Sequence, residues 1–244
     1  MSKPTASIWH PRGKFFVLLA AFFLLYILMP LVRDLRLIFL LSDVLLVAVL
    51  LATVYAVSGS RRSLIAAALL MGLSLVLLYL ARDYSHNLMG AAHISILLFF
   101  VFTAVIILKD VLREERVSGD KIAGAISFYL LLGVAWGILY SLVFWANPAS
   151  FSHIDPSGQM LRGDMFSRFI YFSFVTLTTL GYGDITPTTR VARSLASLEA
   201  VVGQLYLAIL VARLVGLQIS HSGREEGVRS QESGVRKKGK GESD

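Results

Sequence analysis

The sequence has no cysteine among its 244 residues. This absence excludes disulfide bonds, thiolate nucleophiles and cysteine-based metal sites. Charged residues are scarce as well, since they make up 16% of the chain against about 25% in a typical soluble domain. Hydrophobic residues make up 56%, more than a soluble or disordered chain of this size could accommodate. The composition therefore indicates a membrane protein with several spans.

Six apolar stretches are long enough to cross a bilayer as helices, which takes about 20 residues. They are Phe15–Val32, Leu37–Val57, Ser63–Ala81, Leu88–Leu108, Ile122–Ala146 and Ser194–Ile219. A further apolar stretch, Met165–Thr178, has 14 residues, which is too short to span and fits a re-entrant helix. The predicted fold is an all-α membrane protein with six transmembrane helices and one re-entrant helix.

The distribution of basic residues predicts the orientation, because cytoplasmic loops are enriched in Lys and Arg. With the N-terminus placed in the cytoplasm, 16 of the 23 basic residues lie inside and 7 lie outside. Both termini are therefore expected in the cytoplasm. The net charge of +7 then reflects topology and requires no nucleic-acid partner.

Polar segments divide the chain into domains. Residues 1–14 are predicted to be a cytoplasmic N-terminus, and residues 15–108 a four-helix peripheral domain. Residues 122–219 contain the last two spans with the re-entrant helix between them. This last unit is the candidate functional domain, because it holds the most distinctive motif of the chain.

Three connecting or terminal segments have compositions of their own. Residues 109–121 are charged, with apolar residues spaced for a linker helix on the cytoplasmic membrane surface. Residues 147–164 contain two prolines and two glycines and are expected to form an extracellular loop, or turret. Residues 220–244 are rich in charge and glycine and are expected to be a disordered cytoplasmic tail.

The motif Thr-Thr-Leu-Gly-Tyr-Gly-Asp occupies residues 178–184. Residues 179–184 resemble the filter sequence Thr-Val-Gly-Tyr-Gly-Asp of the potassium channel family, with Leu180 in place of Val. The resemblance covers roughly residues 122–219, and it implies a pore helix at 165–178, a selectivity filter at 179–184 and an inner helix at 194–219. The chain is similar to six-transmembrane prokaryotic channels with one pore loop, which implies the cell membrane, a bacterial inner membrane, as its location.

The resemblance implies that the filter binds potassium ions through stacked backbone carbonyls and the hydroxyl of Thr179. These ion-binding residues are Thr179, Leu180, Gly181, Tyr182 and Gly183. A potassium ion must exchange its hydration shell for protein oxygens at matched cost, and glycine permits the backbone angles of such a ribbon. Leu180 and Tyr182 are expected to point away from the ions and to wedge the filter against the pore helix.

One chain supplies one filter ribbon, so a closed ring requires four chains. The resemblance therefore implies a homotetramer with cyclic symmetry. Its other partners are potassium ions and membrane lipids, and no cofactor is expected. Enzyme chemistry finds no support, because the sequence contains no metal-ligand cluster, phosphate-binding loop or nucleophile arrangement.

Residues flanking the filter are candidates for its support. Thr178 and Asp184 adjoin it directly. Tyr171 lies 13 residues before Asp184, where many relatives carry a Trp that bonds the filter aspartate. A hydrogen bond between Tyr171 and Asp184 would brace the outer filter, and plain aromatic packing of Tyr171 is the alternative.

The inner helix contains candidates for the gate. Gly203 matches the hinge glycine of the family, although close packing against a neighbouring helix is an alternative use. Helical spacing places one stripe along the cavity and inner mouth, which can gate by dewetting: Gln204, Leu207, Val211 and Val215. Arg193 begins this span as an interfacial anchor or as a partner for a neighbouring chain.

Glu199 is a carboxylate inside an apolar stretch, and intramembrane ionisable groups are functional hypotheses by default. It lies one turn outward of Gly203 and could hydrogen-bond behind the filter, coupling gate to filter. The alternative is a protonated or snorkelled residue with a structural role.

The fourth span lacks the charges of a voltage sensor. Such a sensor needs several Arg or Lys residues at every third position, because each charge moved through 100 mV yields about 2.3 kcal/mol. Leu88–Leu108 contains none, so weak or no voltage dependence is predicted. Asp43 is expected to pair with a local polar group, with a remnant countercharge as the alternative. His93 is expected to be hydrogen-bonded within its helix, with a proton sensor as the alternative.

The predicted function is passive, potassium-selective transport through a tetrameric pore. One alternative is a potassium transporter subunit, but related pore modules there occur four to a chain with degenerate filters. Another is a non-conducting membrane regulatory subunit, against which the intact filter motif argues. The sequence leaves the gating stimulus open.

Overall fold

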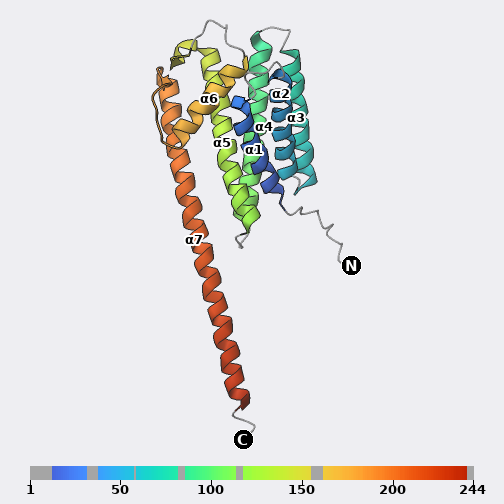
Figure 1. Cartoon of the computed structure of the whole chain (residues 1–244), viewed down its shortest axis with the longest axis vertical. Helices are drawn as coiled ribbons and strands as arrows, with labels where there is room; N and C mark the ends of the chain where they lie inside the picture. Colours follow the sequence, from blue (N-terminus) through green and yellow to red (C-terminus); the bar gives the residue numbers. More distant parts are fainter. Residues whose placement is uncertain are drawn as a thin grey trace.

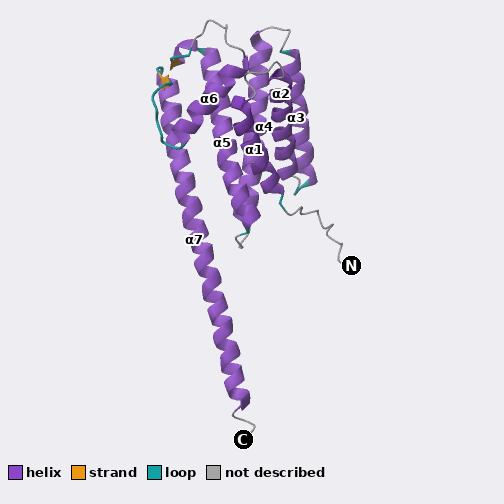
Figure 2. Ribbon diagram, in the orientation of Figure 1, coloured by secondary structure: helices purple, strands orange, loops and turns teal. Residues whose placement is uncertain are grey.

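The computed structural model describes the backbone of residues 13–31, 38–57, 59–81, 86–113, 118–154 and 162–240. Side chains are described at residues 13–24, 47–57, 59–81, 88–113, 118–154 and 167–216. Nearly all of this part is helical (Figure 2). The elements are α1 (Lys14–Leu31), α2 (Ile38–Ala56), α3 (Arg61–Leu80), α4 (His86–Arg113), α5 (Gly119–Ala146), η2 (Pro148–Ser150), β1 (Phe151–Ser152), α6 (Arg162–Leu177), β2 (Thr186–Pro187) and α7 (Arg190–Lys240).

Each apolar stretch of the sequence lies in a helix, and the bounds are close to the predicted ones except at the ends of α4 and α7. Four helical segments in the described part are long and apolar enough to cross a membrane. They are Arg61–Leu80, Leu88–Arg113, Gly119–Ala146 and Arg190–Gly216. The parts of α1 and α2 whose side chains are described, Lys14–Leu24 and Val47–Ala56, are shorter apolar helical segments.

Helix α5 is the central support of the molecule. Helices α1 to α4 lie on one side of it, and α6 and α7 lie on the other (Figure 1). One buried cluster joins α5 to the first four helices through residues such as Phe15, Phe99 and Leu131. A second, mostly aromatic cluster joins α5 to α6 through Tyr140, Phe169 and others. Helix α6, which precedes the filter motif, thus packs against α5, and α5 is itself packed on both sides.

The predicted linker helix at residues 109–121 is wrong for the described part. Residues 109–113 continue α4, Ser118 precedes α5, and residues 119–121 begin it, whereas residues 114–117 lie outside the described part. The physical reason is the helix cap: Ser118 Oγ accepts a hydrogen bond from the backbone N–H of Lys121 over 3.3 Å. The polar sequence therefore marks two helix ends that meet at one end of the molecule.

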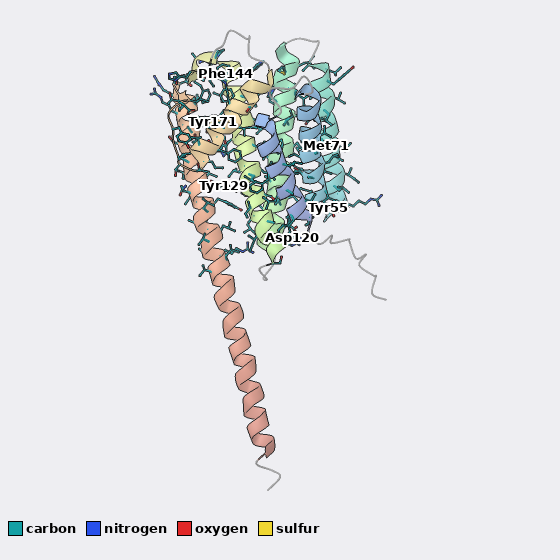
Figure 3. All side chains as sticks on the ribbon, viewed as in Figure 1. Tyr55, Met71, Asp120, Tyr129, Phe144 and Tyr171 are labelled. Carbon is teal, nitrogen blue, oxygen red and sulfur yellow. The ribbon has the colours of Figure 1, made fainter. Side chains whose placement is uncertain are left out.

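An ion-pair cluster ties these helix ends together. Asp110 of α4 pairs with Lys14 of α1 at 2.6 Å and with Lys121 of α5 at 3.4 Å. Asp120 accepts a hydrogen bond from the backbone N–H of Phe15 over 3.1 Å, at the first turn of α1. Figure 3 shows Asp120 at the end of the bundle opposite to Tyr171. Lys14 and Lys121, which the sequence placed on one side of the membrane, thus meet at one end of the bundle.

The inner helix α7 is longer than the predicted span. It has 51 residues and continues to Lys240, far beyond the other helices (Figure 1). The structure therefore contradicts a disordered tail for residues 220–240. The chain has no proline after Pro187, so nothing in the sequence forces the helix to stop. Residues 241–244 lie outside the described residues, as do residues 1–12 of the predicted N-terminal segment.

The structure describes part of the predicted turret. Asn147 accepts a hydrogen bond from the N–H of Ala149 and starts the short helix η2. Strand β1 then pairs antiparallel with β2, with Phe151 opposite Pro187 and Ser152 opposite Thr186. Phe151 and Ile154 are buried, which explains why this part of the loop is fixed. The pairing joins the segment before α6 to the segment after the filter motif, and residues 155–161 lie outside the described part.

Candidate ion-conducting site

Backbone N–H groups of the filter motif donate hydrogen bonds to carbonyls at the C-terminal end of α6. The N–H of Thr179 donates to the carbonyl of Thr176 over 2.9 Å. The carbonyl of Val175 accepts from Leu180 over 2.9 Å and from Gly181 over 3.2 Å. The last carbonyls of a helix have no partners within the helix, so the motif satisfies them. This arrangement leaves the opposite edge of the ribbon free of contact with α6.

The sign of the backbone φ angle alternates along the motif. The φ angle is +60° at Thr179, +63° at Gly181 and +78° at Gly183, whereas Leu180 and Tyr182 are not in the positive region. Alternation of this kind places successive N–H groups on one side of a ribbon, and the carbonyls then share the other side. A ribbon of aligned carbonyl oxygens is what replacement of a cation's hydration shell requires.

Glycine is needed here for its backbone freedom and not for space. A Cβ added at Gly181 or Gly183 would meet nothing within 4 Å. The positive φ angle is what side chains resist. Thr179 adopts the same angle, which the sequence did not indicate. Its Oγ1 donates to the carbonyl of Thr178 over 2.6 Å. A positive φ angle at a residue other than glycine is backbone strain, which is typical of functional sites.

The predicted wedging of the filter against its own pore helix is not found in the single chain. Leu180 is 55% exposed and Tyr182 is 67% exposed. The contact between ribbon and α6 runs through backbone groups, so these two side chains stay outside the core of this chain. Their exposure leaves two large apolar groups beside the filter without cover.

The outer end of the motif is braced by Tyr171. Its hydroxyl donates a hydrogen bond to Asp184 Oδ2 over 2.8 Å, which is the contact suggested by the 13-residue spacing. Asp184 Oδ1 accepts a second hydrogen bond, from the N–H of Ile185, over 3.1 Å. Tyr171 lies at the same end of the bundle as Phe144 (Figure 3). The carboxylate is therefore fixed between the pore helix and the chain that leaves the filter.

Replacing Tyr171 with Phe is expected to loosen the outer filter. A hydrogen bond to a charged group is worth about 1.5–3 kcal/mol, and the variant loses this bond while keeping the ring. On the prediction that the motif is a potassium filter, we expect a lower potassium-to-sodium flux ratio in liposomes, by about tenfold. Tyr79→Phe is the control, because Tyr79 is an exposed residue of α3. An unchanged ratio in the Tyr171 variant would show that this bond does not brace the filter.

Helix α7 touches the motif from the other side. A Cβ at Gly203 would lie 2.5 Å from the carbonyl oxygen of Leu177, the last residue of α6. The Gln204 side chain reaches the filter, since its Nε2 donates to Thr179 Oγ1 over 3.5 Å. The close approach at Gly203 fits the packing interpretation of this glycine. The inner helix is thus in contact with the base of the filter.

The rest of the predicted pore stripe lies on an uncovered face of α7. Leu207, Val211 and Val215 are exposed in the chain.

Two arginines connect α7 to other elements. Arg193 Nε donates to the carbonyl of Pro187 over 3.2 Å, which anchors the first turn of α7 to β2. Near the inner end of the predicted pore stripe, the guanidinium of Arg213 donates to the carbonyl of Leu112 at the end of α4.

Comparison with known proteins agrees with this geometry. Residues 124–217 match a family model described as "Ion channel". A protein named LctB from Bacillus caldotenax is 31% identical over 101 residues, which cover 41% of this chain and 75% of that protein. The chain belongs to a family of ion channels and not of enzymes.

Two further relatives are similar to the chain over a comparable length. Potassium channel subfamily K member 16 of Homo sapiens is 35% identical over 105 residues, covering 40% of this chain and 30% of that protein. A protein named LctB from Geobacillus stearothermophilus is 28% identical over 106 residues, covering 43% of this chain and 78% of that protein. No solved structure matches the chain. With its apolar helices, the channel module makes this a multi-pass membrane protein.

Glu199 of this channel module is fully buried where three helices meet. Its Oε2 accepts a hydrogen bond from the Tyr140 hydroxyl of α5 over 2.5 Å. Its Oε1 lies 2.5 Å from Ser173 Oγ of α6. The structure thus places Glu199 beside the pore helix, as the sequence suggested. The two partners were not predicted, because isolated Tyr and Ser residues in apolar helices carry no distinctive signal.

A second unpredicted feature of the channel module is the pair Gly133 and Gly137 on α5. A Cβ at Gly133 would lie 2.5 Å from the Phe174 ring, and one at Gly137 would lie 2.9 Å from the Ile170 backbone. The spacing Gly-x-x-x-Gly is a known signal for close helix approach in membranes, and it could have revealed this contact. It lets α6 lie directly on α5.

His93 of α4 makes the local polar contact that the sequence predicted. His93 Nδ1 lies 2.8 Å from the carbonyl of Met89, one turn earlier on α4. Asp43 lies outside the residues whose side chains are described. On α4 the charged residues Lys109, Asp110 and Arg113 are confined to the end of the helix.

Proposed function

We propose that this chain forms a potassium-selective channel, in which ions pass passively through the filter at residues 179–184. The observation that carries the proposal is the alternating backbone of the motif, with its N–H groups bound to the end of α6. This geometry supports carbonyls that face a common axis, which is the chemistry of a potassium filter. The ion-binding residues are Thr179, Leu180, Gly181, Tyr182 and Gly183.

We also propose that the channel is a homotetramer, because one ribbon cannot surround an ion. Helix α7 exposes large apolar side chains that another copy of the chain could cover. These are Leu198, Val201, Leu205 and Ile209. Leu180 and Tyr182 are exposed beside the filter as well. In this arrangement, the stripe from Gln204 to Val215 lines the cavity, and the apolar surface of α3 contacts lipid.

The proposed topology has six spans, with α1 and α2 counted as the first two. The start of α1 and the end of α7 lie toward the same end of the molecule (Figure 1), which supports termini on one side. The excess of basic residues at that end supports the cytoplasmic side. A bacterial inner membrane is the proposed location.

Flux through liposomes tests this function. The purified full chain is reconstituted, and uptake of potassium and of sodium is measured separately. A conducting channel with a potassium filter is expected to admit potassium and largely exclude sodium. A transporter would saturate at low turnover, and a regulatory subunit would give no flux of either ion. Either of these results would replace the proposal.

Voltage is expected to have little effect on opening. The charges of α4 lie only at its end, and Asp110 there is paired with Lys14 and Lys121. Moving them through the membrane field would require these pairs to break. The conductance of the reconstituted channel should therefore change little between negative and positive potentials. A steep conductance–voltage curve with several gating charges would contradict this.

A further inference from the structure

The Glu199 carboxyl belongs to a hydrogen-bonded chain that crosses three helices. Tyr140 Oη lies 2.5 Å from Glu199 Oε2, and Ser173 Oγ lies 2.5 Å from Glu199 Oε1. Ser173 Oγ also lies 2.7 Å from the carbonyl oxygen of Gly133. All three side chains are buried. The chain therefore consists of three short oxygen–oxygen contacts closed off from solvent.

Each of these contacts needs a proton between its two oxygens, because two oxygens at hydrogen-bond distance otherwise repel. The hydroxyls of Tyr140 and Ser173 carry one proton each, and the carbonyl of Gly133 carries none. Three contacts therefore require a third proton, and the Glu199 carboxyl is the remaining group that can carry it. With that proton, Tyr140 donates to Glu199, Glu199 donates to Ser173, and Ser173 donates to Gly133.

The charges around Glu199 lead to the same assignment. Among the described residues, the titratable groups facing it are Tyr140 and Tyr129, both from α5. Helix α6 contributes the neutral hydroxyl of Ser173. Within the part of the chain that the structure describes, Asp110 pairs with two lysines, and no ion pair involves Glu199. A buried carboxylate without a cation is costly, whereas a neutral carboxyl with these partners is fully satisfied.

We propose that Glu199 is a neutral, proton-carrying residue that positions the pore helix between α5 and α7. The proposal deepens the proposed channel function and rests on it for the effect on ions. Ser173 lies within one turn of Val175 and Thr176, whose carbonyls hold the filter N–H groups. Gly203, one turn further along α7, contacts the end of the same helix. The proton thus fixes α6, to whose C-terminal end the filter motif is hydrogen-bonded.

Infrared spectroscopy tests the proton directly and requires no conduction. Spectra of the wild type and of Glu199→Gln are recorded in lipid at neutral pH. The difference is expected to contain the C=O stretch of a protonated carboxyl group, present only in the wild type and shifted in deuterated water. Carboxylate bands in its place would overturn the assignment.

Flux through liposomes tests the positioning role. The Gln amide reproduces the pattern of the neutral carboxyl, since it donates to Ser173 and accepts from Tyr140. Glu199→Gln is therefore expected to keep the potassium flux and the potassium-to-sodium ratio of the wild type. Glu199→Ala leaves the hydroxyls without partners and is expected to lower the ratio about tenfold.

Ser95→Ala is the matched control, because it removes a buried hydroxyl contact of 2.8 Å, to Ser74, between α3 and α4. It should leave the ratio unchanged. A Gln variant that fails like the Ala variant would overturn the proposal, as would an Ala variant with the wild-type ratio. If the wild type itself gives no selective flux, the proposed function fails, and the infrared result still decides the protonation of Glu199.

Discussion

Replacing Gly181 with alanine is expected to abolish potassium flux without unfolding the protein. Gly181 has a φ angle of +63°, and an L-residue in the left-handed region costs roughly 1–2 kcal/mol. In the proposed ring of four chains the cost becomes about 4–8 kcal/mol. Since about 1.4 kcal/mol corresponds to tenfold in an equilibrium, the conducting backbone would become a rare state. Flux of labelled potassium into liposomes measures the effect.

Gly72→Ala is the matched control for this variant. Both glycines have open space around the position of a Cβ, but only Gly181 has a positive φ angle. The control therefore adds the same methyl group without the backbone strain, and it should conduct like the wild type. Size-exclusion profiles of both variants confirm that assembly is intact. Wild-type flux through the Gly181 variant would contradict the proposed role of the ribbon backbone.

Replacing Gly203 with alanine is expected to destabilise the pore module. The added Cβ would lie 2.5 Å from the Leu177 carbonyl and 2.8 Å from Leu177 Cδ1. Backbone atoms cannot give way as a flexible side chain can, so α7 must move off the end of α6. Overpacking of this kind costs typically about 1–3 kcal/mol. We expect a melting temperature lower by several degrees, together with reduced flux.

Gly216→Ala on the same helix is the comparison for Gly203. Nothing lies within 4 Å of the Cβ position at Gly216, so the substitution should be neutral or stabilise α7 by about 0.5–1 kcal/mol. A hinge at Gly203 predicts another outcome, in which Gly203→Ala keeps its melting temperature and loses only opening. That result would contradict the packing interpretation.

The filter and most helix positions were predictable because each carries a strong local signal. Long apolar stretches give membrane helices, and α5 begins within a few residues of the predicted Ile122. The motif at 178–184 predicted a pore, and the spacing of Tyr171 and Asp184 suggested a bond that the structure contains. These features depend on short sequence patterns with a clear physical meaning.

The features that were missed depend on contacts between distant segments. Ser173 and Tyr140 gain their importance only from meeting Glu199, 26 and 59 residues away. The end of α4 was mistaken for a linker because its charged residues look solvent-exposed, whereas Asp110 pairs with Lys14, 96 residues away. The tail looked disordered because its composition offers no core, and composition does not report helix continuation.

The reversal potential of single channels tests the central claim most directly. The purified full chain is placed in a planar bilayer with potassium chloride on one side and sodium chloride on the other. A filter of backbone carbonyls at residues 179–184 predicts a reversal potential far toward the potassium equilibrium value, with little contribution from sodium or chloride. A reversal potential near zero, insensitive to the potassium gradient, would contradict the account.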